Sequence, residues 1–475
     1  MNDPRSSIPG VDAILSDSAA QALVERFGRG RTVQAIRDAI DEVRAEIARD
    51  PAPWEGRAGR PEEYLVRARA ALEEGEVPSL RHVINGTGVV LHTNLGRAPL
   101  AEAAVDAMRR VAGRYTNLEY DLEEGRRGSR YVHCVSLLTE LSGAEDALVV
   151  NNAAAALILA LNTLALGREV AVSRGELVEI GGGFRIPEMI ERAGARLVEV
   201  GSTNRTRVGD YEAALGPETK AILKVHRSNF RITGFTEEAS VAELAELAAD
   251  HEVPLVHDLG SGLMVPATEL GLPDEPRAAE SLAAGADVVV VSGDKLLGGT
   301  QAGVILGRAD LIGRMRRNPL CRALRVDKVT LAGLEATLRL YRRPERVSAE
   351  VPTLAMLRVS TSELEARARA LCARIREVLG SERADRVGLS VVRTRGAVGG
   401  GTYPGVELDS WAVALRPAVG PHALADALRG GSPPVVGRIV DDVLTLDVRT
   451  VFPDQEDELA RRVDEALRGT EAAPA

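Results

Sequence analysis

The sequence predicts an α/β fold: a seven-stranded, mostly parallel sheet with a small N-terminal helical domain and a C-terminal α+β domain. Between residues 147 and 306, short apolar runs alternate with helical patterns, which is typical of a parallel sheet with helices on both faces. The chain before this region carries helical periodicity, and the chain after it mixes strands and helices. The whole chain has 475 residues, which is longer than one ordinary domain.

We expect the chain to divide into a helical domain at 1–50, a linker at 51–80, a catalytic core at 81–345 and an α+β domain at 346–475. In the first part, apolar residues recur at spacings of three and four, as on an amphipathic helix. They are Val33, Ile36, Ile40, Val43 and Ile47. Thr32 is the expected N-cap. Asp50-Pro-Ala-Pro-Trp54 breaks the pattern, and a second helix is expected at about 61–75.

Seven apolar runs predict the strands of the central sheet. They are 147–150, 169–172, 197–200, 222–225, 255–257, 287–291 and 303–306. Helices are expected between them, as at 153–166, 186–193 and 241–250. A short glycine-rich connection joins the last two runs, so these are the expected exception to parallel order.

The region after residue 346 predicts a separate α+β domain. A helix is expected at about 361–380 and a final helix at 457–467. The strand-like runs between them are 389–393, 412–415, 435–440 and 443–448.

Composition narrows the class of protein. The net charge of −10 gives no support to a strongly basic surface for nucleic acid. No apolar run is long enough to span a membrane, and the start lacks a signal-peptide core. The cysteines Cys134, Cys321 and Cys372 are scattered without metal-ligand spacing. A reduced, cytoplasmic protein without a metal site or a membrane partner is expected.

One lysine stands at a position suited to chemistry. The valine run that begins at Asp287 ends in Ser292-Gly-Asp-Lys295, so Lys295 lies at the carboxyl edge of the predicted sheet. Open α/β sheets place their ligands at that edge. A lysine there suggests an amine that forms a Schiff base with a carbonyl group. For an isolated lysine, a solvated loop position is the favoured alternative.

Two further strand ends carry suitable residues. Asn152, Ala153 and Ala154 open a helix after the first strand, where free backbone N–H groups can hold a phosphate. The alternative is an N-cap followed by helix-forming alanines. Asp258 ends the fifth strand and can hold a protonated pyridine nitrogen. The alternative is an Asp that caps a turn.

The order of these residues resembles the fold-type I pyridoxal-phosphate enzymes. The resemblance implies that Lys295 holds pyridoxal 5′-phosphate (PLP), that Asp258 pairs with the ring nitrogen and that the Asn152–Ala154 helix start binds the phosphate. It also implies that Asn229 contacts the ring oxygen and that Ser292 adds a phosphate contact.

Longer blocks resemble the bacterial selenocysteine synthase family, the L-seryl-tRNA(Sec) selenium transferases, over nearly the whole chain. They are Val83 to Pro99, Glu176 to Pro187, Gly201 to Thr206, Ser292 to Gly299 and Asn318 to Lys328, together with the N-terminal Phe27-Gly-Arg29 element. The resemblance implies conversion of seryl-tRNA(Sec) to selenocysteinyl-tRNA(Sec). Water leaves the seryl β-carbon to give an aminoacrylyl intermediate, to which selenium from selenophosphate adds.

The resemblance also implies roles for individual side chains. Lys295 is a natural general base for the α-proton, and Asp294 protonates the leaving hydroxyl or positions Lys295. Selenophosphate needs cations, and guanidinium groups match phosphate geometry. Ordinary surface ion pairing is the alternative for these arginines. The family blocks point to Arg97, Arg322 and Arg325.

The N-terminal domain resembles the family's tRNA-recognition domain. Its basic cluster is formed by Arg26, Arg29, Arg31 and Arg37. Such a cluster can contact phosphates of a folded RNA. From charge alone, a solvated charged face is the favoured alternative, and the resemblance reverses that preference. The family likeness further implies a dimer-based homo-oligomer, typically a decamer.

Two other functions are the alternatives. A PLP-dependent ammonia-lyase or β-eliminating enzyme acting on a small sugar acid or amino acid would lack the N-terminal RNA-binding domain, which is present here. A non-catalytic RNA-binding paralogue would have lost Lys295 or Asp258, and both are present.

Overall fold

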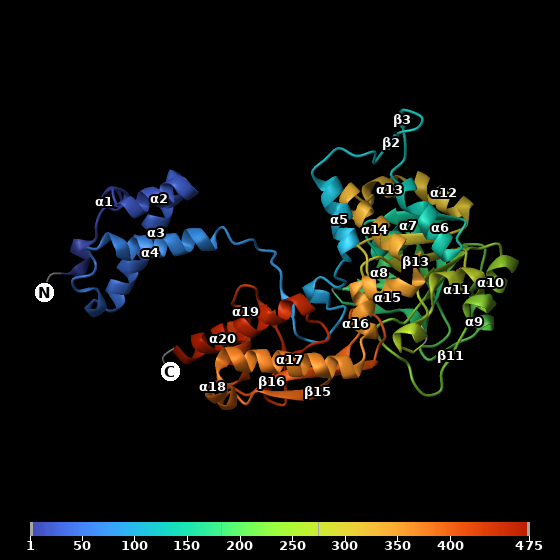
Figure 1. Ribbon diagram of the computed structural model, residues 1–475. Helices are drawn as coiled ribbons and strands as arrows, with labels where there is room; N and C mark the ends of the chain where they lie inside the picture. The colour runs from blue at the N-terminus through green and yellow to red at the C-terminus, as the bar shows by residue number, and fades with distance from the viewer. Residues whose placement is uncertain (1–2, 182, 274, 473–475) are drawn as a thin grey trace. The chain divides into compact units, whose positions relative to one another are not determined.

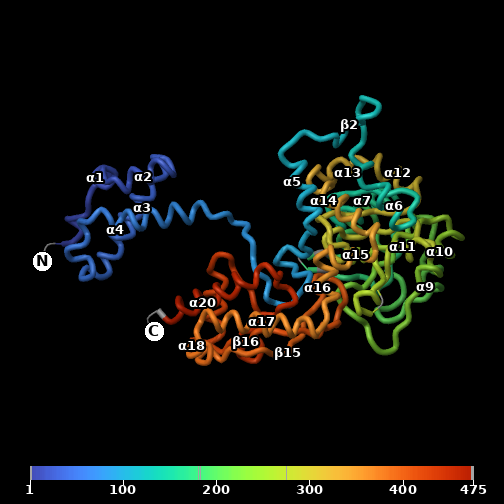
Figure 2. Tube along the Cα trace, viewed as in Figure 1, coloured from blue at the N-terminus to red at the C-terminus, as the bar shows by residue number. Residues whose placement is uncertain are grey.

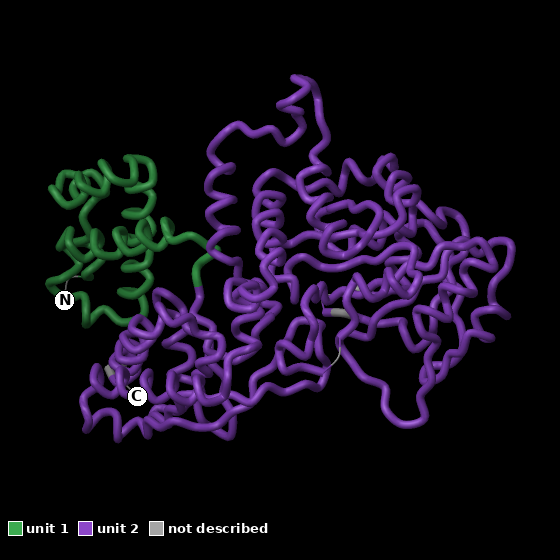
Figure 3. The backbone as a smooth tube through the Cα atoms, turned by 45° about the vertical axis from the view of Figure 1, so that its right-hand side comes forward, with its two compact units in different colours: residues 1–82 green, residues 83–475 purple. Residues whose placement is uncertain are grey.

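The computed structural model describes residues 3–181, 183–273 and 275–472. The chain divides into two compact units, Met1–His82 and Val83–Ala475, which Figure 3 shows in different colours. Each unit has a hydrophobic core of its own. None of the described helices has the length and apolarity needed to cross a membrane.

The N-terminal unit is a bundle of helices. Its elements are η1 (Pro4–Ser7), α1 (Val11–Leu15), α2 (Ser18–Phe27), α3 (Arg29–Arg49), η2 (Ala52–Trp54) and α4 (Pro61–Glu74). The apolar stripe of α3 is buried, as expected from its spacing, and Ile36 and Val43 are fully covered. The buried Tyr64 side chain donates a hydrogen bond to the carbonyl oxygen of Ala58 at 2.6 Å, which ties α4 to the preceding turn.

Two expectations for this unit were wrong. Thr32 is not the N-cap of α3, because the helix begins at Arg29, and the Thr32 hydroxyl instead donates to the carbonyl oxygen of Gly28. Most of the segment 51–80 is not a linker. Helix α4 buries Leu65 and Leu72 in the same core as α3, because its apolar positions cover the stripe of that helix.

The second unit is built on a seven-stranded sheet in the order β4-β14-β13-β12-β10-β5-β8. The strands are β4 (Asp146–Val150), β5 (Glu169–Ser173), β8 (Arg196–Val200), β10 (Thr219–Val225), β12 (Leu255–Asp258), β13 (Val288–Ser292) and β14 (Gly303–Gly307). β14 runs antiparallel to both of its neighbours, and the other pairs are parallel. The expected fold class and its exception are confirmed.

Helices cover both faces of this sheet (Figure 1). On one face lie α7 (Ala153–Ala165), α8 (Ile186–Arg192), α12 (Ala309–Arg317) and α13 (Pro319–Ala323). On the other face lie α6 (Val132–Ser142), α9 (Val208–Ala214), α10 (Val241–Asp250), α11 (Ala278–Ala283) and α14 (Lys328–Leu340), and α5 (Glu102–Ala112) packs on α14. Strands buried on both sides explain the continuous apolar runs in the sequence.

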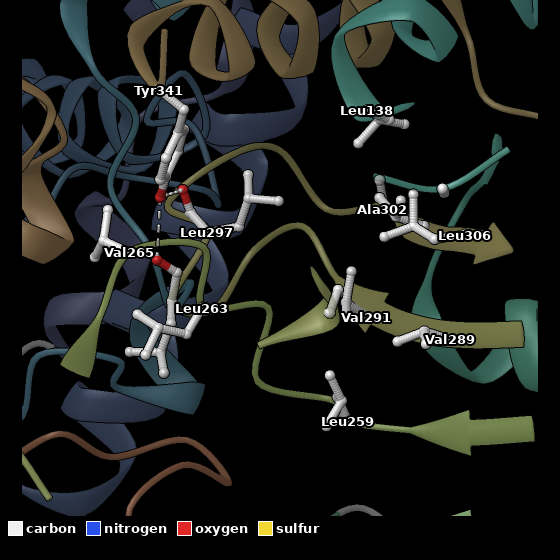
Figure 4. Packing of buried hydrophobic residues seen from close by; sticks show 14 of the residues in the cluster. Leu138, Leu259, Leu263, Val265, Val289, Val291, Leu297, Ala302, Leu306 and Tyr341 are labelled. Atoms are coloured by element: carbon white, nitrogen blue, oxygen red, sulfur yellow. Dashed lines mark hydrogen bonds between the residues drawn. The ribbon is translucent and has the colours of Figure 1, made fainter. Parts of the chain in front are cut away.

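The core beneath the predicted catalytic lysine is tightly organised (Figure 4). Val289 and Val291 of β13 and Leu306 of β14 point into one layer of buried side chains. At its edge, the buried Tyr341 hydroxyl donates a hydrogen bond to the carbonyl oxygen of Leu297 at 2.8 Å. The turn after β13 is therefore anchored to the helical layer just beyond Lys295.

The C-terminal part forms a four-stranded sheet in the order β15-β16-β19-β18. Its strands are β15 (Ser390–Ala397), β16 (Glu407–Leu415), β18 (Arg438–Val440) and β19 (Val443–Asp447). Helices α15 (Pro344–Glu350) and α16 (Pro352–Arg358) precede it, and α17 (Thr361–Leu379), α18 (Ser381–Arg386), α19 (Pro421–Arg429) and α20 (Glu456–Ala472) share its core. Figure 2 shows α17 and α20 beside this sheet.

Short elements connect these layers. They are β1 (Ile84–Asn85), η3 (Thr93–Leu95), β2 (Tyr120–Asp121), β3 (Arg126–Arg127), η4 (Arg174–Glu176), β6 (Glu179–Ile180), β7 (Phe184–Arg185), β9 (Arg205–Thr206), β11 (Glu237–Glu238), η5 (Ala267–Leu270), β17 (Val435–Val436) and η6 (Pro453–Gln455). The β2–β3 hairpin projects from the second unit (Figures 1 and 2). β1 pairs with β17, so the first residues of this unit are joined to its C-terminal part.

Candidate active site

Lys295 is buried at the carboxyl edge of the central sheet. It lies in the turn after β13, and 6% of the residue is exposed. Its Nζ is 3.5 Å from the carbonyl oxygen of Gly401, which belongs to the loop between β15 and β16. Burial lowers the pKa of Lys295 from its usual value, and the nearby carboxylate of Asp258 opposes that shift. The position differs from that of a solvated loop lysine.

Asp258 is the last residue of β12 and is also buried. Burial raises the pKa of Asp258 to about 6, while the charges of Lys295 and His226 act against this rise. Gly260 lies against both groups. A Cβ at that position would be 3.7 Å from Lys295 Nζ and 4.0 Å from Asp258 Oδ1, and its φ of +65° suits glycine. The structure thus brings the predicted lysine and carboxylate together.

Helix α7 begins at the same edge. Asn152 is its N-cap, and its Oδ1 accepts a hydrogen bond from the backbone N–H of Ala155 at 2.8 Å. Within the described residues, the N–H groups of Ala153 and Ala154 have no hydrogen-bond acceptor. The capping role and the anion-binding role are therefore compatible, because the cap uses a donor one residue further into the helix.

Asp294 is held by two neighbours. Arg97 Nη1 donates to Asp294 Oδ2 at 2.8 Å, and Ser292 Oγ donates to Asp294 Oδ1 at 2.6 Å. Asp294 is 7% exposed, so the pair with Arg97 is largely shielded from water. Arg97 itself has a φ of 62°, which few residues other than glycine adopt. The Ser292 hydroxyl hydrogen is engaged by this carboxylate.

Arg97 and Asp294 line a cavity of about 830 Å³, here called the arginine cavity. Its other lining residues include Thr93, Asn151, Thr300, Gln301, Arg325, Asp327 and Thr330. Arg325 Nη1 is 3.9 Å from Glu119 Oε1, a weak pairing that leaves the side chain 39% exposed. Two of the three arginines expected to bind an anion therefore share one cavity with Asp294.

Two predicted site residues, Arg322 and Asn229, do not line the arginine cavity. Arg322 is exposed on α13, does not line the arginine cavity and makes no ion pair with a described residue. Asn229 is exposed, and its Nδ2 donates to the carbonyl oxygen of Glu179 at 2.6 Å. Their roles towards an anion and a cofactor ring stay predictions.

The structure adds residues that were not singled out from the sequence. The backbone N–H of His226 donates to the carbonyl oxygen of Asp258 at 2.9 Å, and His226 Nε2 lies 3.2 Å from Glu275 Oε1. Gly401 contacts Lys295, as described above. His226 directly follows a predicted strand, which was a usable signal. Glu275 lies in an irregular segment without any pattern.

In the N-terminal unit, two of the four predicted arginines are already paired. Arg26 contacts Glu73 at 3.2 Å, and Arg31 contacts Glu76 at 2.6 Å. Arg29 and Arg37 are exposed and make no ion pair with a described residue. The free positive charge of the cluster therefore lies on the face of α3. Across residues 3–181, 183–273 and 275–472, no group of three His, Cys, Asp or Glu side chains could hold a metal ion.

Comparison with known proteins identifies the family. The family described as "L-seryl-tRNA selenium transferase" matches residues 83–452, and the family described as "Selenocysteine synthase N terminal" matches residues 5–44. An L-seryl-tRNA(Sec) selenium transferase of Moorella thermoacetica is 56% identical and covers 82% of this chain and 83% of its own length. One of Solidesulfovibrio magneticus is 50% identical and covers 94% and 95%.

A solved structure supports the fold independently. The structure of D-glucosaminate-6-phosphate ammonia-lyase is 21% identical, with a TM-score of 0.56, and covers 82% of this chain and 97% of its own. At that identity, the likeness concerns the fold. The family matches and the Solidesulfovibrio relative, in contrast, extend into both units. The chain belongs to the L-seryl-tRNA selenium transferase family.

Proposed function

We propose that this chain is a PLP-dependent L-seryl-tRNA(Sec) selenium transferase that converts seryl-tRNA(Sec) to selenocysteinyl-tRNA(Sec) with selenophosphate as the donor. The buried Lys295–Asp258 pair at the sheet edge carries the proposal, in a chain that is 46–56% identical to relatives of that name. The same relatives favour this activity over an ammonia-lyase acting on a small acid, which only a fold-level likeness suggests.

The residues present fit PLP. Lys295 supplies a buried amine, Asp258 supplies a carboxylate for the ring nitrogen, and the N–H groups of Ala153 and Ala154 at the Asn152-capped helix start are free for a phosphate. Ser292 and Asn229 belong to the expected set by family likeness alone, and Ser292 would have to release Asp294 in order to donate to the phosphate. When bound, the cofactor supplies an electron sink for the substrate's α-carbon.

Lys295 and Asp258 have distinct tasks in this proposal. Lys295 removes the proton from the seryl α-carbon, and its lowered pKa favours the neutral amine that a base requires. Asp258 must be ionised to hold a proton on the ring nitrogen. Burial raises the pKa of Asp258 to about 6, a value that already includes the opposing effect of the nearby Lys295 and His226, so the carboxyl is ionised at neutral pH.

Asp294, Arg97 and Arg325 act on the leaving hydroxyl and on selenophosphate in this proposal. Asp294 is held in place by Ser292 and Arg97, and in this proposal it either passes a proton to the leaving β-hydroxyl or positions Lys295. Arg97 and Arg325 bind selenophosphate in the arginine cavity. Arg322 belongs to the same anion site on the family likeness alone.

The N-terminal unit binds the tRNA in this proposal. Arg29 and Arg37 provide unpaired charge, and Arg26 and Arg31 must exchange Glu73 and Glu76 for phosphates. The full proposal places the enzyme in the cytoplasm as a dimer-based homo-oligomer, typically a decamer.

The deciding experiment is turnover of seryl-tRNA(Sec) with selenophosphate by the PLP-loaded protein. We expect selenocysteinyl-tRNA(Sec) as the product and no product from Lys295→Ala. Borohydride reduction followed by peptide mass analysis should find the cofactor attached at Lys295. An active enzyme that carries its cofactor on another lysine would refute the site, and a loaded but inactive enzyme would refute the reaction.

A further inference from the structure

A second cavity of about 480 Å³ opens beside the proposed active site, and we call it the His226 cavity. Its volume lies in the range of about 300–1,000 Å³ that is usual for small-ligand sites. The lining residues used below are His226, Arg227, Phe230, Arg231, Glu275 and Tyr403. They come from the loop after β10, the segment before α11 and the loop between β15 and β16.

The His226 cavity adjoins the reacting groups on two sides. His226, in its wall, donates its backbone N–H to the carbonyl oxygen of Asp258 at 2.9 Å. On the other side, Gly401 contacts Lys295 Nζ, and Tyr403 of the same loop lines the cavity. The Glu275 carboxylate also acts electrostatically on Lys295. The cavity therefore lies beside the loops that hold the two reacting groups, although Lys295 and Asp258 do not line it.

The lining suits an unpaired nucleoside. Phe230 is half-buried and offers an aromatic surface on which a base can stack, whereas Tyr403 is 3% exposed and forms part of the wall. Arg227 is paired with Glu238 at 2.5 Å, whereas Arg231 is exposed and makes no ion pair with a described residue. Arg231 is thus free for a phosphate. Glu275 is 4% exposed, and its Oε1 accepts no aligned hydrogen bond from the described residues.

We propose that the His226 cavity binds the 3′-terminal nucleoside of the aminoacyl-RNA. This inference rests on the proposed function, in which the serine is esterified to the terminal ribose. With the seryl amine at Lys295, the ribose and its base must lie next to the reacting groups, where the cavity is. Arg231 contacts the adjoining phosphate, Phe230 faces the base, and the Glu275 carboxylate accepts from an amino group of the base.

The lining also argues against a small free amino acid as the occupant. A free carboxylate would need one compact cationic clamp next to the lysine. In the cavity, Lys224 and Arg227 are paired with Glu176 and Glu238, and Arg231 makes no ion pair with a described residue. The buried Glu275 carboxylate would repel an anionic ligand.

The test compares Phe230→Leu and Arg231→Ala with Arg192→Ala, an exposed arginine on α8 outside the cavity. With PLP-loaded protein, we expect the two cavity variants to raise the KM for seryl-tRNA(Sec) about tenfold at a kcat within about twofold, and Arg192→Ala to behave as the parent. Seryl-RNA whose terminal nucleotide lacks its base should raise the parent's KM equally, and should add nothing further in Phe230→Leu.

Direct binding provides a readout without turnover. Adenosine 5′-monophosphate should bind the PLP-loaded protein, and Arg231→Ala should weaken that binding about tenfold, with Arg192→Ala unchanged. The inference is overturned if the parent is active and the KM for seryl-tRNA(Sec) changes neither in the two variants nor when the terminal base is missing. The proposed function would then stay intact. If the parent does not turn over seryl-tRNA(Sec), the proposed function fails, and a lack of nucleotide binding then overturns the cavity assignment as well.

Discussion

Lys295 and Asp258 show how burial tunes two neighbouring groups in opposite directions. Burial penalises each charged form, so the pKa of the lysine falls and that of the carboxyl rises to about 6. Each group opposes the shift of the other. The protein thereby keeps a base and an acid whose protonation states respond to small local changes, which is typical of reactive sites.

Asp258→Asn should reveal this shift in the cofactor-free protein. The folded pKa of about 6 lies above the ordinary value of 3.8, so the folded state holds the proton more tightly. Stability from this group is present below about pH 4 and is lost as the pH rises to 6. Because asparagine does not titrate, the variant should gain about 3 kcal/mol relative to the parent between pH 4 and 6. Urea unfolding across this range measures the difference, and a pH-independent difference would contradict the burial argument.

Asp294 and Arg97 should show a trade-off between anion binding and turnover. Asp294 occupies the Arg97 guanidinium, which the proposed function assigns to selenophosphate. Asp294→Asn should therefore tighten the binding of inorganic phosphate about tenfold, because hydrogen bonds between charged groups contribute about 1.5–3 kcal/mol. The same change should lower kcat by at least about 100-fold, since the acid is lost. Calorimetry and turnover measure the two effects separately.

Ser292→Ala is the matched control, because it removes one hydrogen bond to Asp294 and leaves its charge in place. We expect a smaller loss of kcat and unchanged phosphate affinity. Weaker phosphate binding in Asp294→Asn would show that the carboxylate orients Arg97 for the anion instead of competing with it.

Some of these residues were accessible to sequence reasoning and others were not. Asp258, Asn152 and Lys295 each follow a recognisable strand, and parallel strand ends meet at one edge. The contact between Arg97 and Asp294 joins residues 197 positions apart, and no local pattern encodes it. Nor does any local pattern encode the approach of Gly401 to the lysine, because it depends on packing between the central sheet and the C-terminal part.

At the scale of elements, strands were predicted to within a few residues because burial on both faces makes each one a continuous apolar run. The antiparallel direction of β14 followed from a connection too short for a crossover. That β14 also pairs with β4 was not predictable, because the partner lies about 150 residues away in the sequence.

β14 pairs with β4, and the chain continues from β4 into α7. Gly303 of β14 therefore lies against the start of that helix. A Cβ on Gly303 would lie 2.1 Å from the carbonyl oxygen of Asn152. Gly303→Ala should therefore push the helix start away, cost about 1–3 kcal/mol of stability or more and weaken PLP binding. Urea unfolding and cofactor titration check both effects.

Gly209→Ala is the control for that substitution. Gly209 lies in α9 with an ordinary φ, and a Cβ there would meet no described atom within 4 Å, so alanine should stabilise the chain slightly. If Gly303→Ala binds PLP as tightly as the parent, the start of α7 does not bind the phosphate of the cofactor.

At the scale of the whole molecule, the boundary expected at residue 50 was wrong because the proline-rich segment after Asp50 resembles a linker. The chain turns there and returns as α4, whose Tyr64 and Leu65 complete the core of the first unit. The boundary between the compact units instead falls between His82 and Val83. The acidic net charge gave no support to RNA binding, although the sequence itself contains the local basic cluster of Arg26, Arg29, Arg31 and Arg37, since charge averaged over a chain says little about one face.

Because the two compact units divide between residues 82 and 83, we expect two N-terminal truncations to have opposite outcomes. Removal of residues 1–82 takes away a unit with its own core, so the remaining chain should fold, bind PLP at Lys295 and lose tRNA(Sec) affinity by at least about 100-fold. Removal of residues 1–50 leaves α4 without the helices that it packs against. The side chains of Tyr64, Leu65 and Leu72, which are 0–5% exposed in the full chain, would then face water, and we expect this chain to aggregate. On both truncated chains, filter binding measures tRNA(Sec) affinity, cofactor absorbance measures PLP binding and light scattering measures aggregation. In the full chain, Arg29→Glu with Arg37→Glu should reproduce the loss of affinity, and undiminished binding by either the 83–475 chain or this double variant would remove the N-terminal unit from tRNA recognition.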